Sequence, residues 1–418
     1  KVLMTNHCVY DCKYCMNRCS NDVPRATFTP DELCRLVIEF YKRNYIEGLF
    51  LSSGVLKNPS YTMERICETL MLLRTKYRFN GYIHVKAIPG APDELLSRAG
   101  YLADRVSINL ELPTAQSLSK LAPNKSFKTI LEPMEKITGT IAANRLALGK
   151  EARMERSSIN RYLTGSIFNQ NGTDNGQAAL SGTQRTALES GDKLSLPAAS
   201  KDMCVKRPFA PAGQSTQMII GATPETDLTL IRTTQHLYKN YDLKRVFYSA
   251  YIPLNEDSAL PQLDADVPLL REHRLYQADW LLRFYGFQAD ELLSESRPNF
   301  NEQLDPKCDW AIRHLGQFPV EVQNASYDML LRIPGIGPKS ARRIVETRRY
   351  AKLDFDILKK IGVVLKRAHY FITCNGRMMY RIPIEESYIT SCLTDDNHKE
   401  NWEITHQNEK YHQLSLFE

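Results

Sequence analysis

The sequence predicts an α/β fold followed by a small all-α domain. Strand and helix patterns alternate over residues 1–139 and resume near residue 214. Such alternation predicts parallel strands joined by right-handed helical crossovers. Six strand–helix units are expected, which is fewer than the eight of a closed barrel. The length of 418 residues also exceeds that of one ordinary domain, so a second domain is expected.

The six expected strands are short apolar runs bounded by turn residues. They cover residues 1–6, 48–54, 81–89, 104–112, 214–221 and 245–252. The first helix has the clearest start, because Thr29 precedes a proline at the first helical position. We expect that helix to reach residue 44, and further helices over residues 61–79, 92–102 and 225–239.

The remaining segments define the expected domains. Residues 1–262 form the α/β domain, interrupted at 149–202 by an insertion rich in Ser, Thr, Asn, Gln and Gly that we expect to be flexible. Residues 263–300 form a helical connection with interleaved basic and aromatic residues, which suits either an amphipathic bridging helix or stacking on bases. Residues 301–375 form the all-α domain, and 376–418 form a C-terminal extension and tail.

Three cysteines near the start of the chain carry the strongest chemical signal. Cys8, Cys12 and Cys15 form a C-x3-C-x2-C pattern within eight residues. Thiolates suit soft metals, and three of them can bind three irons of a [4Fe–4S] cluster, which leaves the fourth iron open for chemistry. A zinc knuckle with His7 or Cys19 is the alternative, although zinc sites favour two C-x2-C pairs or a Cys/His partner pair.

This spacing, with Tyr14 directly before the third cysteine, resembles the radical S-adenosylmethionine (SAM) superfamily. The resemblance implies a partial (β/α)6 TIM-like barrel that holds a [4Fe–4S] cluster and SAM. It implies an enzyme in which one electron from the cluster cleaves SAM and yields a 5′-deoxyadenosyl radical, which abstracts hydrogen from the substrate. An electron donor is implied as a partner.

The same resemblance places cofactor contacts at the ends of the strands. The family has a Gly-Gly-Glu-like turn after its second strand, where this chain has Ser-Ser-Gly without the acid. Polar residues alternate along the fourth strand, which implies contact with the ribose or the methionine carboxylate, and a glycine turn after the fifth strand implies contact with adenine. The implied residues are Tyr14, Ser53, Gly54, Ser107, Asn109, Glu111 and Gly221.

A second motif lies near residue 335. Residues 330–345 predict a helix, a tight Gly-x-Gly turn and a second helix, whose N-terminus attracts anions. The segment resembles the helix-hairpin-helix module, which implies binding of nucleic-acid phosphates without regard to sequence. The alternative is a protein–protein packing element. The expected contacts are Gly335, Gly337, Lys339, Ser340 and Arg342.

The last residues form a third motif. Gln413, Leu414, Leu416 and Phe417 lie in a Gln-Leu-Ser-Leu-Phe peptide at the end of a polar tail. The peptide resembles the motif that binds the bacterial sliding clamp. The alternative is that the tail folds back over the helical domain and covers apolar surface.

Taken together, a radical SAM barrel, a phosphate-binding hairpin and a clamp peptide indicate DNA as the substrate. The whole chain resembles bacterial radical SAM proteins of DNA modification or repair that are paired with a uracil-DNA-glycosylase-like protein. That resemblance supplies no reaction. One alternative is an enzyme that modifies RNA or tRNA, and another is a DNA-binding protein whose iron–sulfur cluster is structural.

Composition sets outer limits on these readings. The net charge of +6 permits a polyanionic partner without requiring one. The seven other cysteines are scattered, which favours reduced thiols in the cytoplasm over a disulfide framework. No apolar run is long enough to predict a membrane span. Because the first strand begins at Lys1, we expect an N-terminal piece to precede it.

Overall fold

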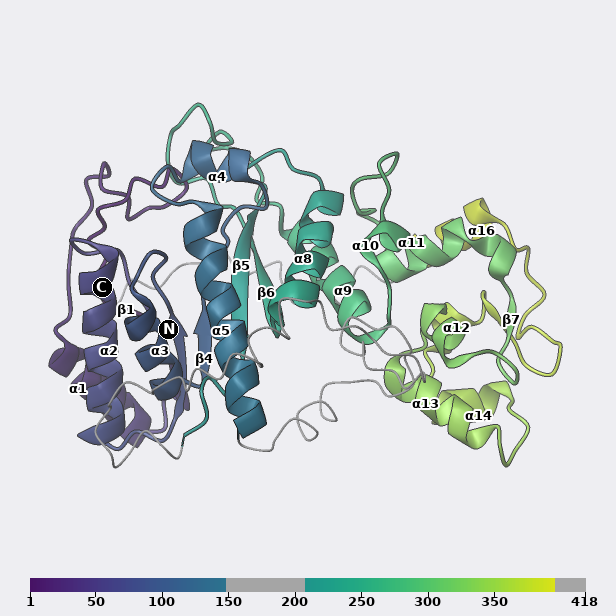
Figure 1. The fold of residues 1–418 in the computed structure, drawn as a ribbon. Helices are drawn as coiled ribbons and strands as arrows, with labels where there is room; N and C mark the ends of the chain where they lie inside the picture. The colour runs from purple at the N-terminus through teal and green to yellow at the C-terminus, as the bar shows by residue number, and fades with distance from the viewer. Residues whose placement is uncertain (148–206, 395–418) are drawn as a thin grey trace, which may run out of the picture. The chain divides into compact units, whose positions relative to one another are not determined.

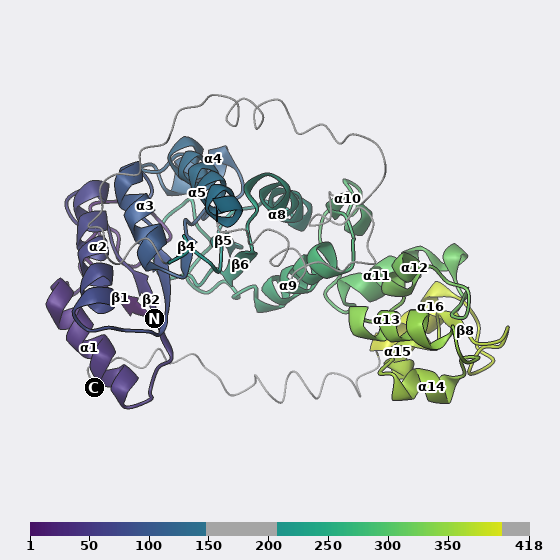
Figure 2. The ribbon, with the colours of Figure 1, turned by 60° about the horizontal axis from the view of Figure 1, so that its bottom comes forward.

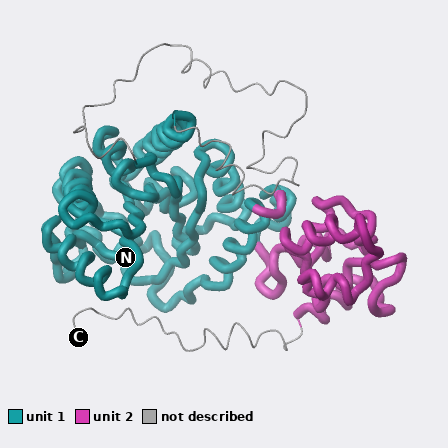
Figure 3. The backbone as a smooth tube through the Cα atoms, turned by 90° about the horizontal axis from the view of Figure 1, so that it is seen from below, with its two compact units in different colours: residues 1–283, 288–299 teal, residues 284–287, 300–418 magenta. Residues whose placement is uncertain are grey.

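The computed structural model describes residues 1–147 and 207–394 (Figure 1). The chain divides into two compact units (Figure 3): unit 1 comprises residues 1–283 and 288–299, and unit 2 comprises residues 284–287 and those from 300 onward. The expected insertion at 149–202 and the C-terminal peptide fall outside the described residues. Each unit is described by itself below.

Six parallel strands form the sheet of unit 1 in chain order, which confirms the predicted α/β fold. Because all the strands run the same way, their carboxyl ends lie along one edge, where βα folds bind their ligands. The strands are β1 (Val2–Leu3), β2 (Gly48–Ser52), β3 (Tyr82–Lys86), β4 (Arg105–Ser107), β5 (Gln214–Ile220) and β6 (Arg245–Ala250).

Helices cover one face of this sheet, as Figure 2 shows. Alternate strand residues such as Leu51, Val85 and Met218 are fully buried, whereas their neighbours Phe50 and His84 are only half-buried. A period of two is the signature of a strand with two unlike faces. Successive helices contact one another in the order α1 (Pro30–Lys42), α2 (Pro59–Thr75), α3 (Asp93–Leu102), α5 (Phe127–Ala147) and α8 (Asp227–Tyr241).

The sequence predicted the first helix well and missed two later ones. Thr29 caps α1 and forms a reciprocal capping box with Glu32, and Pro30 occupies the first turn. The helices α4 (Ala115–Leu121) and α5 were not anticipated. Pro133 lies inside α5, where it removes a helical hydrogen bond. Tertiary packing outweighs that cost, because Pro133 is buried on the same apolar face as Ile137.

The fourth strand is shorter than the predicted 104–112, because it ends at Ser107. The side chain of Thr216 on β5 explains the early end. Its hydroxyl accepts from the N–H of Leu110 at 2.9 Å and donates to the carbonyl of Ile108 at 2.7 Å, so it replaces backbone partners of the ladder. Glu111 then rejoins β5 with a φ of +68°, in the left-handed region that few non-glycine residues adopt.

The helix α9 (Leu269–Phe284), expected within a connecting segment, packs on β6 of unit 1. The hydroxyl of Tyr276 donates to the carbonyl of Tyr248 at 2.8 Å, and Glu272 accepts from the N–H of Ala250 at 2.5 Å. A short helix, α10 (Ala289–Leu292), follows and contacts α8.

Unit 2 is mainly helical, as predicted, and it also contains a pair of short parallel strands, β7 (Val320–Glu321) and β8 (Ile372–Thr373). The rings of Phe287, Trp310, Phe318 and Phe371 meet edge to face in its core. None of the helices in the described ranges is long and apolar enough to cross a membrane. The helices are α11 (Pro306–Arg313), α12 (Tyr327–Arg332), α13 (Pro338–Thr347), α14 (Phe355–Lys360), α15 (Leu365–Ala368) and α16 (Glu386–Thr394).

Candidate cluster and cofactor site

The three cysteines lie in the loop after β1, at the carboxyl edge of the sheet. Cys12 is 6% exposed, and Cys8 and Cys15 are half-buried. The N–H of Val55, just after β2, points at the sulfur of Cys8 at 3.4 Å. A hydrogen bond to sulfur of this kind stabilises a thiolate that binds iron. The loop therefore places its thiols next to the end of the second strand.

Two side chains hold the shape of this loop. The guanidinium of Arg25 donates to the carbonyls of four loop residues at 2.6 to 3.0 Å, namely Asn6, Asn17, Arg18 and Asn21. From the segment after β6, the amide of Asn255 donates to the carbonyls of Lys13 at 2.7 Å and Cys15 at 3.1 Å. Because the loop lacks regular secondary structure, these bonds satisfy carbonyls that would otherwise lack partners.

A buried group of charges lies beside the loop. The ammonium of Lys125 is 3.1 Å from a carboxylate oxygen of Glu111 and donates to the hydroxyl of Tyr14 at 3.3 Å. Lys86, at the end of β3, is 3.7 Å from the same carboxylate oxygen. The side chains of Glu111 and Lys125 are only 8% and 13% exposed. Two cations around one carboxylate leave a net positive charge close to the cysteines.

The electrostatics of this group favour its charged form. Burial alone would raise the pKa of Glu111, but Lys125 and Lys86 outweigh it and lower that pKa to about 2. Burial would lower the pKa of Lys125, and Glu111 instead holds it well above its ordinary value. Burial raises the pKa of the Cys12 thiol to about 11, opposed by the charge of Lys125. Binding of iron would replace the proton of that thiol.

The other polar residues that were predicted to contact SAM also lie at the carboxyl edge of the sheet, and they differ in their hydrogen-bond partners. The buried hydroxyl of Ser53 has no hydrogen-bond partner among the described residues, which leaves it available to a ligand. Asn109 donates to the side chain of Gln217 at 3.4 Å, and Ser107 donates weakly to the carbonyl of Val85 at 3.5 Å. Both side chains therefore already have protein partners.

The two predicted glycines have packing reasons for their identity. A Cβ at Gly54 would overlap the carbonyl oxygen of His7, so this glycine lets the cysteine loop lie against the end of β2. Gly221 has a φ of +86°, and a Cβ there would meet Pro268 at 2.6 Å. Both positions therefore require glycine for reasons within the protein, whatever ligand lies beside them.

In unit 2, the predicted hairpin consists of α12, a tight turn and α13. Gly335 has a φ of +82°, and a Cβ there would overlap the carbonyl oxygen of Val364. Gly337, by contrast, has a φ of −100° and caps α13, and a Cβ there would lie in ordinary contact, 3.4 Å from the hydroxyl of Tyr285. The absence of a Cβ at Gly335 thus lets a neighbouring turn approach, and contact of both glycines with nucleic acid stays a prediction.

The side chains of the hairpin also separate into two groups. Lys339 and Arg342 are exposed on α13, where they can reach a phosphate. Ser340 is buried, and its hydroxyl donates to the carbonyl of Gly362 at 2.7 Å. Lys307 of α11, which the sequence did not single out, donates to the carbonyl of Ile336 in the turn at 2.6 Å, and burial lowers the pKa of Lys307 to about 7.

Comparison with known families agrees with this geometry. Residues 2–142 match the model of the radical SAM superfamily, and residues 320–347 match the helix-hairpin-helix motif. The N-terminal part of the chain is a radical SAM domain. Enzymes of that superfamily use a [4Fe–4S] cluster and SAM. No curated protein matches the chain.

Solved structures resemble the fold only distantly. Methylornithine synthase (PylB) aligns with a TM-score of 0.41 and 13% identity over 68% of this chain and 60% of its own. The [FeFe]-hydrogenase maturase HydG aligns with a TM-score of 0.40 and 12% identity, over 67% of this chain and 49% of its own. HydG from Carboxydothermus hydrogenoformans aligns with a TM-score of 0.41 and 11% identity, over 68% of this chain and 50% of its own. The chain thus spans 49% to 60% of these structures, and no assignment rests on them.

The residues at the radical SAM site fit the cluster. Each thiolate of a cubane binds a different iron, so the three sulfurs need not converge on one point. A zinc site needs such convergence, and within residues 1–147 and 207–394 no three His, Cys, Asp or Glu side chains converge on one ion. The N–H of Val55 favours deprotonated sulfur at Cys8, and the charge of Lys125 opposes the burial that raises the pKa of Cys12.

The sequence analysis did not single out four residues of this site, namely Lys125, Lys86, Arg25 and Asn255. The charged residue Lys86 at the end of an otherwise alternating strand was a signal that could have been read, whereas Arg25 and Asn255 act through contacts that only the fold creates.

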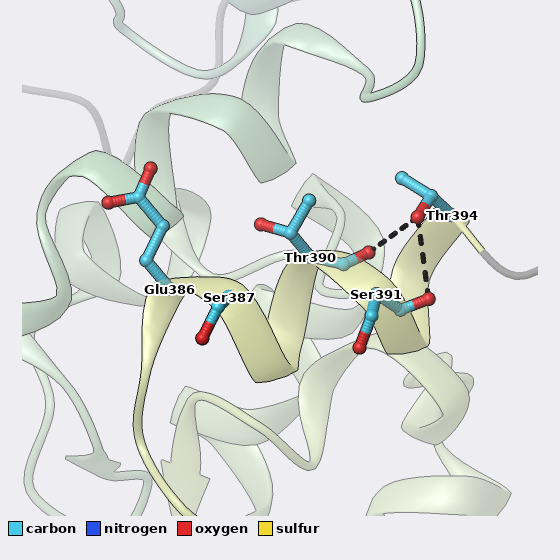
Figure 4. A pocket seen from close by; sticks show the side chains of 5 residues that line it. All are labelled: Glu386, Ser387, Thr390, Ser391 and Thr394. Atoms are coloured by element: carbon cyan, nitrogen blue, oxygen red, sulfur yellow. Dashed lines mark hydrogen bonds between the residues drawn. The ribbon is translucent and has the colours of Figure 1, made fainter.

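The pocket in Figure 4 is lined by one side of α16, with four hydroxyls and the carboxylate of Glu386. It contains no set of residues that suits a cluster or SAM.

Proposed function

We propose that this protein is a radical SAM enzyme that acts on DNA and binds it through the hairpin of unit 2. One observation carries the proposal: a radical SAM domain and a helix-hairpin-helix motif occur in a single chain. A hairpin that binds phosphates without reading bases suits an enzyme whose substrate is a polynucleotide. The exposed Lys339 and Arg342 support phosphate contact.

In this proposal each group of side chains has a defined task. Cys8, Cys12 and Cys15 bind the cluster, and Arg25 and Asn255 keep their loop in place. When bound, the cluster and SAM supply a 5′-deoxyadenosyl radical that abstracts hydrogen from the substrate. The protein orients the cofactors and excludes water.

The residues around the cofactor have tasks of their own in the same proposal. Lys125 holds Tyr14 and Glu111 against the cysteine loop. The free hydroxyl of Ser53 contacts a polar group of SAM, and Ser107 and Asn109 contact SAM in addition to the protein partners that they already have. Gly221 keeps the turn after β5 in its left-handed conformation.

The biological setting that we infer is DNA modification or repair in the cytoplasm. An electron donor is required to reduce the cluster. Two further partners rest on the sequence alone: a sliding clamp that would bind Gln413, Leu414, Leu416 and Phe417, and a uracil-DNA-glycosylase-like protein.

The decisive experiment is anaerobic reconstitution of the cluster, followed by incubation with dithionite, SAM and either duplex DNA or bulk tRNA. We expect 5′-deoxyadenosine and an altered nucleoside in DNA digests, both detected by mass spectrometry, and neither from a Cys12→Ala variant. An altered nucleoside in tRNA alone would replace DNA with RNA as the substrate. If no 5′-deoxyadenosine forms under any condition, the proposed radical chemistry is wrong.

A further inference from the structure

A buried lysine lies against the turn of the hairpin. Lys307, in the first turn of α11, is 8% exposed, and its ammonium donates to the carbonyl oxygen of Ile336 at 2.6 Å. Ile336 is the residue between Gly335 and Gly337. A lysine is seldom buried to this extent unless it has a charged partner. The domain thus places an ammonium group directly beside the turn that is expected to face a phosphate.

Within the described residues, no carboxylate forms an ion pair with Lys307. The acid whose charge acts most on Lys307 is Asp305, and both of its carboxylate oxygens have other partners. One oxygen accepts from the N–H groups of Lys307 and Cys308 at 3.1 Å each, and the other lies 2.9 Å from the guanidinium of Arg367. A buried cation without a counter-charge is costly, and an anion bound at the turn would reduce that cost.

The other groups that act on Lys307 supply no negative charge. Arg332 of α12 and Arg367 of α15 are cations and disfavour the ammonium form. The ring of Tyr285 lies 4.6 Å from the ammonium, and burial raises the pKa of its phenol. Burial also holds the pKa of the Cys308 thiol well above its usual range, so this neighbour is neutral as well. Lys307 is therefore sensitive to any anion that approaches the turn.

The bond to Ile336 also fixes the orientation of one peptide unit in the turn. The peptide between Ile336 and Gly337 carries both the carbonyl that accepts from Lys307 and the N–H of Gly337. In a planar trans peptide these two groups point in opposite directions, so this N–H points away from Lys307. Gly337 is the N-cap of the ten-residue helix α13, whose first N–H groups have no partners within the helix and attract anions.

We infer that Lys307 is a positioning residue of the hairpin's phosphate site. It holds the N–H of Gly337 available to a phosphate and supplies a positive charge on the opposite side of the same peptide. A peptide whose carbonyl already accepts a hydrogen bond is a stronger donor, because linked hydrogen bonds polarise one another. The inference rests on the proposed function, since it requires that the hairpin binds nucleic-acid phosphates. It deepens that function by adding a residue outside the matched motif, which begins at residue 320.

Phosphate binding should then be coupled to protonation of Lys307. Burial lowers the pKa of Lys307 to about 7 in the free protein. A phosphate on the other side of the peptide favours the charged ammonium, so the pKa of Lys307 is higher in the complex and the complex binds more protons. Affinity must therefore fall as the pH rises above 7. A lysine that only supports the fold would show no such coupling.

The test measures the affinity of the full-length protein for a short duplex of mixed sequence, at constant salt, between about pH 6 and pH 9. The variants are Lys307→Met, which keeps a long apolar side chain without the charge, and Lys339→Ala as the matched control. Lys339 is exposed on α13, so its loss removes an expected phosphate contact and leaves Lys307 in place.

We expect the wild-type affinity to fall about eightfold from pH 6 to pH 9, the effect of a one-unit rise in the pKa of Lys307 on binding. Lys339→Ala should bind more weakly at every pH, with the same eightfold fall. Lys307→Met should lose the pH dependence and bind as weakly at pH 6 as the wild type does at pH 9. Calorimetry in two buffers of different ionisation enthalpy should show that the wild type takes up about half a proton at pH 7.5.

Each result bears on one of two claims. If Lys307→Met keeps the eightfold fall, or weakens binding by the same factor at every pH, Lys307 only supports the fold and the inference is wrong, while the hairpin remains a phosphate site. Absence of proton uptake by the wild type leads to the same conclusion and needs no variant that folds. A wild-type protein that does not bind the duplex, or a Lys339→Ala variant with full affinity, would contradict the proposed function itself.

Discussion

The two motif glycines are equivalent in sequence and should respond differently to substitution. In Gly335→Ala, the new residue must adopt a φ of +82°, which costs about 1–2 kcal/mol for a residue with a Cβ. The Cβ would also overlap the carbonyl oxygen of Val364, so the two turns must separate. The bond from the N–H of Val364 to the carbonyl of Gly335 would then weaken, at a cost of about 1 kcal/mol. The expected loss of stability is about 2–3 kcal/mol.

Gly337→Ala is the matched control. Its φ of −100° is allowed for alanine, and the nearest atom to the new Cβ would be the Tyr285 hydroxyl at 3.4 Å. Replacing glycine where the backbone permits it gains about 0.4–1 kcal/mol from the unfolded state. Alanine is a poorer N-cap than glycine, which offsets that gain. We expect a net change of less than about 1 kcal/mol in either direction.

Hydrogen exchange measured by mass spectrometry distinguishes these cases within unit 2. Peptides that cover α13 and α15 should exchange faster in Gly335→Ala and nearly unchanged in Gly337→Ala, with peptides of the sheet in unit 1 as the internal reference. Faster exchange of similar size in both variants would refute the reasoning, because it would mean that the motif needs glycine at both positions for a common reason. A Gly335→Ala variant that exchanges like the wild type would refute the packing of the two turns.

Three further changes test the site and the hairpin domain. Cys12→Ala should abolish the visible absorbance of the reconstituted cluster, and Cys19→Ala, an exposed cysteine outside the triplet, should retain it; loss in both would contradict the assignment. Lys125→Met should destabilise unit 1 by about 3–5 kcal/mol in urea unfolding, because it removes the nearer cation from the buried carboxylate of Glu111. Adding Glu111→Gln should restore most of that stability, whereas additive losses would argue against the ion pair. Burial lowers the pKa of Lys307 to about 7, so above that pH the unfolded chain binds more protons than the folded one. The unfolding free energy of unit 2 should therefore rise from pH 7 to about pH 9. Lys307→Met should flatten this rise, and an equal rise in the variant would assign it to another group.

Much of the architecture was predictable from local patterns. Short apolar runs predicted all six strands, and Thr29 with Pro30 predicted the start of α1, because patterning and capping act over a few residues. The end of β4 was not predictable in this way. It depends on the hydroxyl of Thr216, which lies more than one hundred residues away in the chain.

The residues of the candidate site also differ in whether local sequence or long-range contacts reveal them. The sequence alone determined the cysteine triplet, its resemblance to the radical SAM superfamily and the first hairpin, because each is a short motif with a characteristic spacing. Only the tertiary structure decided that Lys125 and Lys86 surround Glu111, and that a second turn packs on Gly335. Buried ion pairs and turn-to-turn contacts join residues that are distant in the chain, and a buried charge is stable only where the fold supplies its partner.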